Sequence, residues 1–395
     1  MIVYVAGLGL VSSLGIGVTQ NYDALISQRH GICSLSQELD PLIEGFPVGK
    51  LCINNSDLAE MSGVSTRLPR TALISLLATN EAIEKTGLDI RNYRSGYISA
   101  STVGGIDLTE QFFISCGKDK LRGNLRNIIN HECGRITNLV AEKIEVHTYV
   151  STISTACSSS ANSIIHAARL IKEGRLDVAV AGGADALTAF TLNGFNSLFL
   201  LDPDLCIPFD AKRKGLNLGE GAGYVVLVSE RLVDAGVVSP IVRLSGYSNA
   251  CDAFHQTAMS PEGKGPFISM SGALRMAGIT PSGINYINAH GTATINNDAS
   301  EGNAVCRLFN NNIPALSSTK SYTGHTLGAS GSIEAIFSIL ALTNGVAFPN
   351  LRFSEPIPEL ALIPITEVQH FSINNVLSNS FGFGGNCSSL VFSKI

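Results

Sequence analysis

One cysteine stands where a helix is expected to begin, inside the segment Ser151–Gly174. Residues 151–154 are rich in Ser, Thr and Ile and predict a strand, and Cys157 follows a turn at residues 155–156. Apolar residues then recur at three- and four-residue spacing up to Gly174, which predicts a helix. Unpaired N–H groups and the helix dipole favour a thiolate at such a position, so we expect Cys157 to be a nucleophile. Taken alone, a cysteine with apolar neighbours is also typical of a buried core position.

Three further segments combine glycine, hydroxyl residues and a basic or polar group. They are NAHGTAT at 288–294, STKSYTGH at 318–325 and NSFGFGGN at 379–386, the last expected to be a turn before the final strand. The ends of strands and the starts of helices are where α/β folds assemble their active sites. A cysteine and two histidines that converge there would suit acyl transfer through a thioester.

The elements that must position these segments occur in two similar series. The helix expected at residues 333–343, after His325, repeats the small-residue start, the length and the terminal glycine of the helix after Cys157. We therefore expect two halves, residues 1–240 and 241–395, each alternating strand and helix. Such a repeat predicts a duplicated α/β fold with helices packed between two sheets.

Composition excludes several classes of function. The 395 residues can bury a large core, and with 45% hydrophobic and only 15% charged residues the chain suits a tightly packed enzyme with a subunit interface. A net charge of −5 gives no electrostatic basis for binding nucleic acid or an anionic membrane.

The cysteines and the N-terminus indicate a compartment. Nine scattered cysteines without a CxxC pair favour reduced thiols over a disulfide framework or a zinc site. Residues 1–15 suggest a buried strand and a glycine-rich turn, with no basic stretch of a signal peptide and too short an apolar run to span a membrane. We expect a soluble, cytoplasmic protein.

Taken together, the motifs resemble those of the β-ketoacyl-[acyl-carrier-protein] synthases of the thiolase superfamily, in particular the elongating Cys-His-His class. The resemblance rests on TACSSS around Cys157, NAHGTAT around His290, STKSYTGHTLGASGSIE around Lys320, His325 and Glu334, and NSFGFGGN around Phe381 and Phe383. PFDAKRKGLNLGEGAG at 208–223 and VAGGAD at 180–185 support it, and the matches run in order along essentially the whole chain.

The resemblance implies a fold and a reaction. The fold would be the thiolase-like duplicated αβαβα arrangement of layers with two mixed sheets. The nucleophile would lie in the N-terminal half and both catalytic histidines in the C-terminal half. The reaction would be the decarboxylative condensation of an acyl thioester with malonyl-acyl-carrier protein, which yields 3-oxoacyl-acyl-carrier protein and CO₂. It would serve fatty-acid, polyketide or aryl-polyene biosynthesis.

The resemblance also assigns catalytic roles. Cys157 would take the acyl group, and His290 and His325 would stabilise the enolate that decarboxylation leaves on the thioester oxygen. Both would act as neutral Nε2–H donors. Lys320 would hydrogen-bond His325 or bias it electrostatically. The backbone N–H groups of Cys157 and Phe383 would form the oxyanion hole, and the neighbouring glycines would allow the close approach.

Further residues are implied around the substrate. Thr292 and Thr294, which strand spacing would place on one face, would bind the pantetheine amides, Phe383 would gate the acyl pocket, and Val103 would line that pocket. Asn288, Glu334, Ser378 and Asn379 match a site for a structural Na⁺ or K⁺, since all four offer oxygen ligands. The alternative is a hydrogen-bonded Glu334 without an ion.

The implied partners are proteins. No cofactor or catalytic metal is required, because phosphopantetheine arrives on the acyl carrier protein. A homodimer, or a heterodimer with a related synthase subunit, is expected. The sequence departs from the usual motifs at 158–162, 213–215 and 296–297, and we interpret these departures as effects on the substrate because they would lie around the pocket.

Other functions remain as alternatives. A non-catalytic partner of the chain-length-factor type would lack the nucleophile, whereas Cys157 is present. A thiolase would use a second cysteine near the C-terminus, for which Cys387 is a poor match. The initiating synthases have asparagine where His325 stands, and a papain-like protease would need a different order and local signature.

Overall fold

The computed structural model describes residues 1–35, 44–118, 123–310, 312–360 and 362–395. Its N-terminal half contributes five main strands, which are β1 (Val3–Ser12), β5 (Ser95–Ala100), β6 (Tyr149–Ile153), β7 (Val178–Asp185) and β8 (Gly221–Ser229). The C-terminal half contributes five more, which are β9 (Val242–Cys251), β10 (Tyr286–Asn288), β11 (Ala315–Ser317), β14 (Asn375–Gly382) and β15 (Asn386–Ser393). Shorter strands are β2 (Gly15–Ile16), β3 (Ile32–Ser34), β4 (Pro47–Gly49), β12 (Val346–Ala347) and β13 (Gln369–His370).

Strand pairing proves the duplication that the sequence pattern predicted. In the N-terminal sheet the order is β1-β8-β7-β5-β6, and in the C-terminal sheet it is β9-β15-β14-β10-β11. Both sheets begin with two antiparallel pairs and end with two parallel pairs. Each half therefore follows the same path, and β6, which leads to Cys157, is equivalent to β11, which leads to Lys320 and His325.

The two sheets meet edge to edge. β1 and β9 pair antiparallel at two positions, Tyr4 with Arg243 and Val5 with Val242. The two predicted mixed sheets are thus the two halves of one continuous sheet among the described residues.

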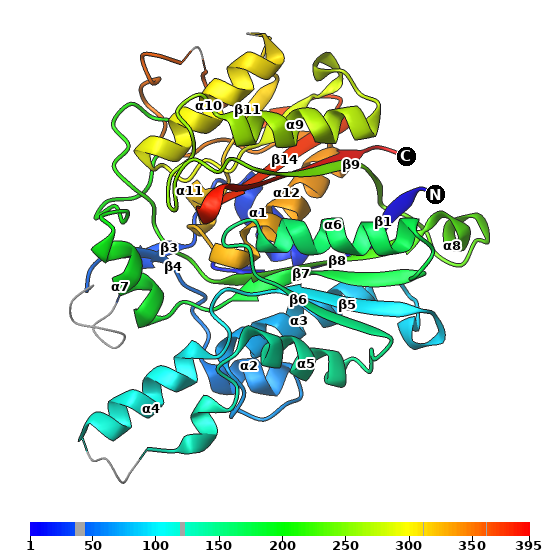
Figure 1. The fold of residues 1–395 in the computed structure, drawn as a ribbon, viewed down its shortest axis with the longest axis vertical. Coiled ribbons are helices and arrows are strands. Elements are labelled where there is room, and N and C mark those ends of the chain that lie inside the picture. The colour runs from blue at the N-terminus through cyan, green and yellow to red at the C-terminus, as the bar shows by residue number, and fades with distance from the viewer. Residues whose placement is uncertain (36–43, 119–122, 311, 361) are drawn as a thin grey trace.

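Helices make three layers around this sheet (Figure 1). The middle layer holds α6 (Ser159–Lys172) and α12 (Ser330–Asn344), and the outer layers hold α3 (Arg70–Glu84) with α5 (Cys133–Lys143) and α9 (Lys264–Ala277) with α10 (Ile295–Phe309). Three hydrophobic clusters match these layers, and the largest surrounds α6 and α12. The remaining helices are α1 (Val18–Ile26), α2 (Asn55–Met61), α4 (Ile106–Lys118), α7 (Ala189–Ser197), α8 (Glu230–Asp234) and α11 (Lys320–Thr323).

Helix α12 is as apolar as a membrane span but belongs to the core. Within the described residues, one helical stretch, Leu327–Asn344, is long and apolar enough to cross a membrane. Of this stretch, 89% is buried inside the fold. Burial between two sheets explains the all-round apolar sequence, since a helix covered on every side needs no polar face.

One element, the glycine-rich turn near the C-terminus, differs from the sequence prediction. Residues 379–382 belong to strand β14, so the turn is confined to Phe383–Gly385 instead of covering 379–386. Helix α9 begins at Lys264 and has Gly265 and Pro266 in its first turn. Proline is tolerated in the first helical turn, where its missing N–H has no intrahelical partner.

The helices of the middle layer touch at Gly331. A Cβ atom at this position would lie 2.8 Å from the Ala161 backbone nitrogen and 2.9 Å from its Cβ, closer than packed atoms allow. The adjacent Ser332 N–H donates to Ser160 Oγ at 2.9 Å. The contact fixes the starts of α6 and α12, and with them the segments that carry Cys157 and His325.

This contact predicts the effect of one methyl group. Gly331→Ala should lower the unfolding temperature, because overpacking costs about 1–3 kcal/mol and outweighs the better helix propensity of alanine. Gly194→Ala is the matched control, since the same change inside α7 meets no atom within 4 Å and should leave the protein equally or more stable. Thermal unfolding of both variants measures this. A Gly331→Ala protein as stable as the wild type would contradict the contact.

Candidate active site

Cys157 lies in a sharp turn between β6 and α6. Ala156 before it has a positive φ of 54°, and the first helical residue is Ser159, two positions after the cysteine. The cysteine is therefore just outside the helix instead of within its first turn. Its side chain is buried, with 6% of its surface exposed.

Burial controls the ionisation of this thiol. It raises the pKa of Cys157 to about 11, although the charge of Lys320 and the N–H groups of Phe383 and Cys157 act in the opposite direction. The local N–H groups favour the thiolate, as predicted, but burial outweighs them, so the predicted thiolate does not form in the free protein at neutral pH. At neutral pH the sulfur carries its proton, which must leave as the sulfur attacks.

Two histidines face this sulfur. His290 follows β10, His325 lies between α11 and a short turn of helix at Leu327–Ala329, and both are buried. Their rings are 5.4 Å apart and nearly perpendicular. One ring nitrogen of each and the Cys157 sulfur all lie within 4.8 Å of one another.

Both histidines are neutral. Burial and the charge of Lys320 lower the pKa of His290 and of His325 well below the ordinary value. Each ring therefore has one N–H donor and one lone pair that can accept a hydrogen bond at physiological pH. Neutral rings are what the predicted role of hydrogen-bond donor requires.

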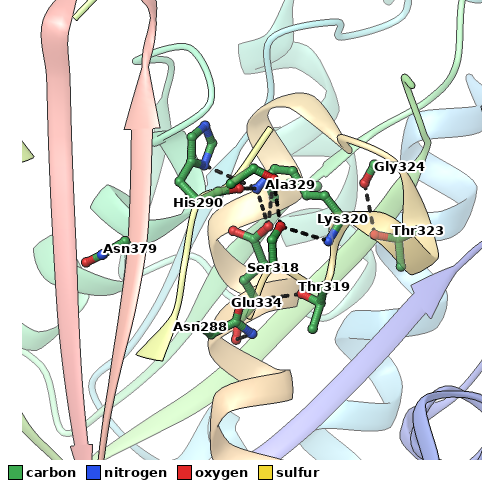
Figure 2. A network of polar contacts seen from close by, with 12 residues as sticks. Asn288, His290, Ser318, Thr319, Lys320, Thr323, Gly324, Ala329, Glu334 and Asn379 are labelled. Atoms are coloured by element: carbon green, nitrogen blue, oxygen red, sulfur yellow. Dashed lines mark hydrogen bonds and ion pairs between the residues drawn. The ribbon is translucent and has the colours of Figure 1, made fainter. Parts of the chain in front are cut away.

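Lys320 determines which nitrogen of His290 carries the proton. Its Nζ lies 2.6 Å from the His290 carbonyl oxygen and 3.2 Å from His290 Nδ1, and it pairs with the Glu334 carboxylate (Figure 2). Because the ammonium group donates to Nδ1, the proton of His290 must be on Nε2.

The predicted partner of Lys320 needs correction. The lysine hydrogen-bonds His290 instead of His325, and its influence on His325 is electrostatic, through the lowered pKa. Neither ring nitrogen of His325 has a hydrogen-bond partner within the described part of the chain. The lowered pKa of His325 agrees with the electrostatic alternative of the prediction, and only the hydrogen bond goes to His290 instead.

The second predicted oxyanion donor lies beside the sulfur. Phe383 begins the turn after β14, and its N–H is close enough to Cys157 to lower the pKa of the thiol. Gly382 permits this approach, since a Cβ there would lie 2.8 Å from the Thr155 carbonyl oxygen. The Phe383 ring stacks on Phe195, with centroids 5.7 Å apart.

These groups line one cavity of about 230 Å³. Cys157, His290, His325, Phe381 and Phe383 lie around it, with Met259 among the other lining residues. Apolar surface dominates beside the few polar groups, which is typical of a small-molecule site.

Thr292 and Thr294 both line this cavity, but for a different reason from the one predicted. They lie in the loop after β10 instead of on a strand, and Thr294 caps the N-terminus of α10. Their hydroxyl groups are 2.9 Å apart. Val103 does not line the cavity, because its N–H donates to Asp185 and its side chain packs with Leu187 and Leu327.

The four residues of the predicted cation site differ in how free their oxygens are. Glu334 Oε2 and Ser378 Oγ are buried and have no hydrogen-bond partner among the described residues, so they fit a cation. Asn379 is engaged, because it accepts from Ser389 and donates to Glu301. Asn288 Oδ1 has only a long contact of 3.4 Å from Thr319.

Sequence reasoning missed Glu301. This buried carboxylate accepts the backbone N–H groups of His290 and Gly291 at 2.9 and 2.8 Å and so holds the loop that carries the histidine. Burial raises the pKa of Glu301 to about 7. It lies in α10, whose ordinary amphipathic sequence gave no signal of the role.

The polar departures after Cys157 have a structural reason. Ser158 and Asn162 hydrogen-bond Asn386 and do not line the cavity. These two residues therefore do not border the cavity, whereas Lys214, Asn296 and Asn297 of the other two departures do line it, as predicted. Cys387, the alternative thiolase base, is also absent from the cavity lining and packs against Met259 and Phe381.

The fold and the site together define a class, that of thiolase-like acyl-transferring enzymes. The chain matches the profile described as the beta-ketoacyl synthase N-terminal domain over residues 2–232 and the corresponding C-terminal domain over residues 241–354. It therefore belongs to the beta-ketoacyl synthase family.

Curated relatives have similar length. The chain is 32% identical to the mitochondrial 3-oxoacyl-[acyl-carrier-protein] synthase of Arabidopsis thaliana, over 100% of this chain and 93% of the relative. It is 31% identical to 3-oxoacyl-[acyl-carrier-protein] synthase 2 of Vibrio cholerae, over 100% and 99% of the two chains.

Solved structures are similar as well. A ketosynthase in complex with its chain length factor from Xenorhabdus doucetiae is 31% identical, with a TM-score of 0.89 over 100% of this chain and 98% of the other. The ishigamide ketosynthase/chain length factor is 26% identical, with a TM-score of 0.91 over 100% and 99%.

The lysine at the centre of the site gives a testable effect on the thiol. Lys320→Met should raise the pKa of Cys157 above about 11, because a positive charge that stabilises the thiolate is lost. Alkylation of Cys157 by iodoacetamide at about pH 8 should then slow, roughly tenfold for each unit of pKa, since the thiolate is the nucleophile. Peptide mass spectrometry measures the rate, which in the wild type should keep rising up to about pH 11.

Lys214→Met is the matched control for this experiment. Lys214 also lines the cavity, but it is exposed and pairs with Asp204 at 3.0 Å. Its loss should leave the alkylation rate nearly unchanged. Equal slowing in both variants would show that Lys320 has no specific effect on the sulfur.

Proposed function

We propose that this protein condenses an acyl thioester with malonyl-acyl-carrier protein to form 3-oxoacyl-acyl-carrier protein and CO₂. One observation carries the proposal, the convergence of the Cys157 thiol with two neutral histidines in a buried cavity. The full-length similarity to 3-oxoacyl-[acyl-carrier-protein] synthases supports it.

In the first half-reaction, Cys157 takes the acyl group. Its sulfur attacks the thioester carbonyl while the thiol proton passes to a neutral neighbour, and His325 has free ring nitrogens for this purpose. The N–H groups of Cys157 and Phe383 stabilise the tetrahedral oxyanion. The carrier's C–S bond then breaks, and the departing pantetheine sulfur takes the proton.

In the second half-reaction, malonyl-carrier protein loses CO₂. The electron pair of the breaking C–C bond forms an enolate, and His290 Nε2–H donates to its oxygen, aided by His325. Lys320 maintains this donor, because it occupies Nδ1. The enolate carbon attacks the acyl-Cys157 carbonyl, the new C–C bond forms, and the Cys157 sulfur leaves as a thiolate that takes a proton from solvent.

No cofactor takes part in this scheme, because phosphopantetheine is supplied by the carrier protein. A structural Na⁺ or K⁺ would be held by Glu334 Oε2 and Ser378 Oγ, with Asn288 Oδ1 nearby. The ion would give the two buried oxygens of Glu334 and Ser378 the partner that they lack among the described residues. Such an ion would stabilise the buried residues around Lys320 without touching the substrate. We also propose a cytoplasmic location.

The partners would be an acyl carrier protein and a second synthase subunit. Strand β6 is at the edge of the sheet, so one side of it is open to pair with another chain. In α4 and the segment after it, Phe113, Ile114, Leu125 and Ile129 expose 61–66% of their surface, which suits an apolar subunit interface. A homodimer or a heterodimer fits, and two related solved structures are described with a chain length factor.

A non-catalytic role of the chain-length-factor type is the second candidate, favoured only by those two structures. It conflicts with the retained nucleophile and both histidines. Detection of acyl-Cys157 by intact mass, after incubation with acyl-carrier protein, decides between the two. A protein that forms no acyl adduct and only stimulates a partner would have the second role.

Substitutions should separate the two half-reactions. Cys157→Ala should abolish condensation and leave the fold intact, because one small buried side chain replaces another. His290→Ala should slow malonyl decarboxylation by about 10²–10³ through loss of an oxyanion donor and slow Cys157 acylation less. His325→Ala should slow both steps, because His325 also accepts the thiol proton during acylation. Release of CO₂ and acyl-enzyme formation are measured separately. Equal losses in both steps of His290→Ala would contradict the assigned roles.

A further inference from the structure

One amide oxygen connects three segments next to the active site. Asn386 Oδ1 lies 2.8 Å from Ser158 Oγ, 2.9 Å from Asn162 Nδ2 and 2.8 Å from Asn249 Nδ2. The first two donors come from the start of α6 and the third from β9. Three donors thus lie within hydrogen-bond distance of one amide oxygen, and the single proton of Ser158 Oγ is shared between this oxygen and the Thr155 carbonyl oxygen, also at 2.8 Å.

The junction joins the two segments that carry the oxyanion donors. Ser158 directly follows Cys157, and Asn386 follows Phe383 after only two glycines. Gly384 and Gly385 both have positive φ, at 79° and 80°. Because glycine adopts backbone conformations that other residues avoid, this turn is conformationally less restricted than one without glycine. The backbone of the turn bonds elsewhere, Gly384 N–H to Gln256 and the Gly385 carbonyl to Asp252.

Asn162 reinforces the junction from the α6 side. Its Nδ2 also donates to Thr155 Oγ1 at 2.9 Å, and its Oδ1 accepts from Ser388 Oγ at 2.8 Å. The network thus runs from the residue two before Cys157 to the strand after the turn. None of Ser158, Asn162 and Asn386 lines the cavity, so the network can act on substrate only through the backbone it holds.

We propose that Asn386 and Asn162 are positioning residues, which hold the Phe383 turn against the start of α6 so that both oxyanion N–H groups face the same carbonyl oxygen. This inference rests on the proposed acyl transfer to Cys157. Without the junction, the glycine turn would sample other conformations, and the Phe383 donor would miss the oxyanion for part of the time.

Two reactions of the same sulfur test the inference. Transfer of an acyl group from an acyl-pantetheine thioester forms an oxyanion, whereas alkylation by iodoacetamide forms none. Asn386→Ala should slow acylation of Cys157 about tenfold or more, which is part of the 10²–10³-fold loss of rate expected when an oxyanion donor is removed. The same variant should change the alkylation rate less than about twofold. Intact mass spectrometry of the full-length protein follows both adducts.

Conservative and paired variants sharpen the result. Asn386→Asp keeps the acceptor oxygen and should restore most of the acylation rate. Asn162→Ala should slow acylation as well, and the double variant should lose less than the product of the two single losses, because both act through one junction. Asn344→Ala, at the far end of α12, is the control and should acylate at the wild-type rate.

The outcomes distinguish this inference from the proposed function. If Asn386→Ala acylates at the wild-type rate, or loses acylation and alkylation equally, the positioning role is overturned and the proposed function stands. If the wild type is alkylated but never acylated, the proposed function is overturned, and the positioning role with it.

Discussion

The Lys320 ammonium group, buried between Glu334 and His290, is the interaction on which the site depends. Its hydrogen bond to Nδ1 leaves the His290 proton on Nε2, and its charge lowers the pKa of both histidines and of the Cys157 thiol. A positive charge is tolerated there because the Glu334 carboxylate pairs with it. Lys320 thereby keeps the Nε2–H of neutral His290 available as a donor and makes the buried Cys157 thiol easier to deprotonate.

The duplicated fold explains how these groups come together. Cys157 and His325 follow equivalent strands, β6 and β11, and each precedes a helix of the middle layer. Because the two helices pack directly against each other at Gly331, residues more than 150 positions apart meet in one cavity. The last turn, Phe383–Gly385, closes the site from the C-terminal sheet and is held to α6 by amide side chains.

Much of this arrangement was predictable from local sequence. The main strands and helices, the repeat of the two halves and the family resemblance all follow from patterns that residues close in sequence create. The candidate catalytic residues Cys157, His290 and His325 could be named in the same way, since they stand in motifs with a recognisable order. Glu301 could not, because an acidic residue on an amphipathic helix is ordinary until its carboxylate is seen to hold the His290 loop.

The sequence by itself determined the identity and order of the reactive groups, because these depend on residue type and on short-range spacing. Tertiary structure decided their protonation states and their hydrogen-bond partners. Burial, which depends on all surrounding layers, raises the Cys157 pKa to about 11 where the local helix start suggested a thiolate. The direction of the Lys320 side chain makes His290, and not His325, the hydrogen-bond partner of the lysine. Packing also turns the polar residues after Cys157 toward Asn386, away from the substrate, because hydrogen-bond partners are set by three-dimensional neighbours.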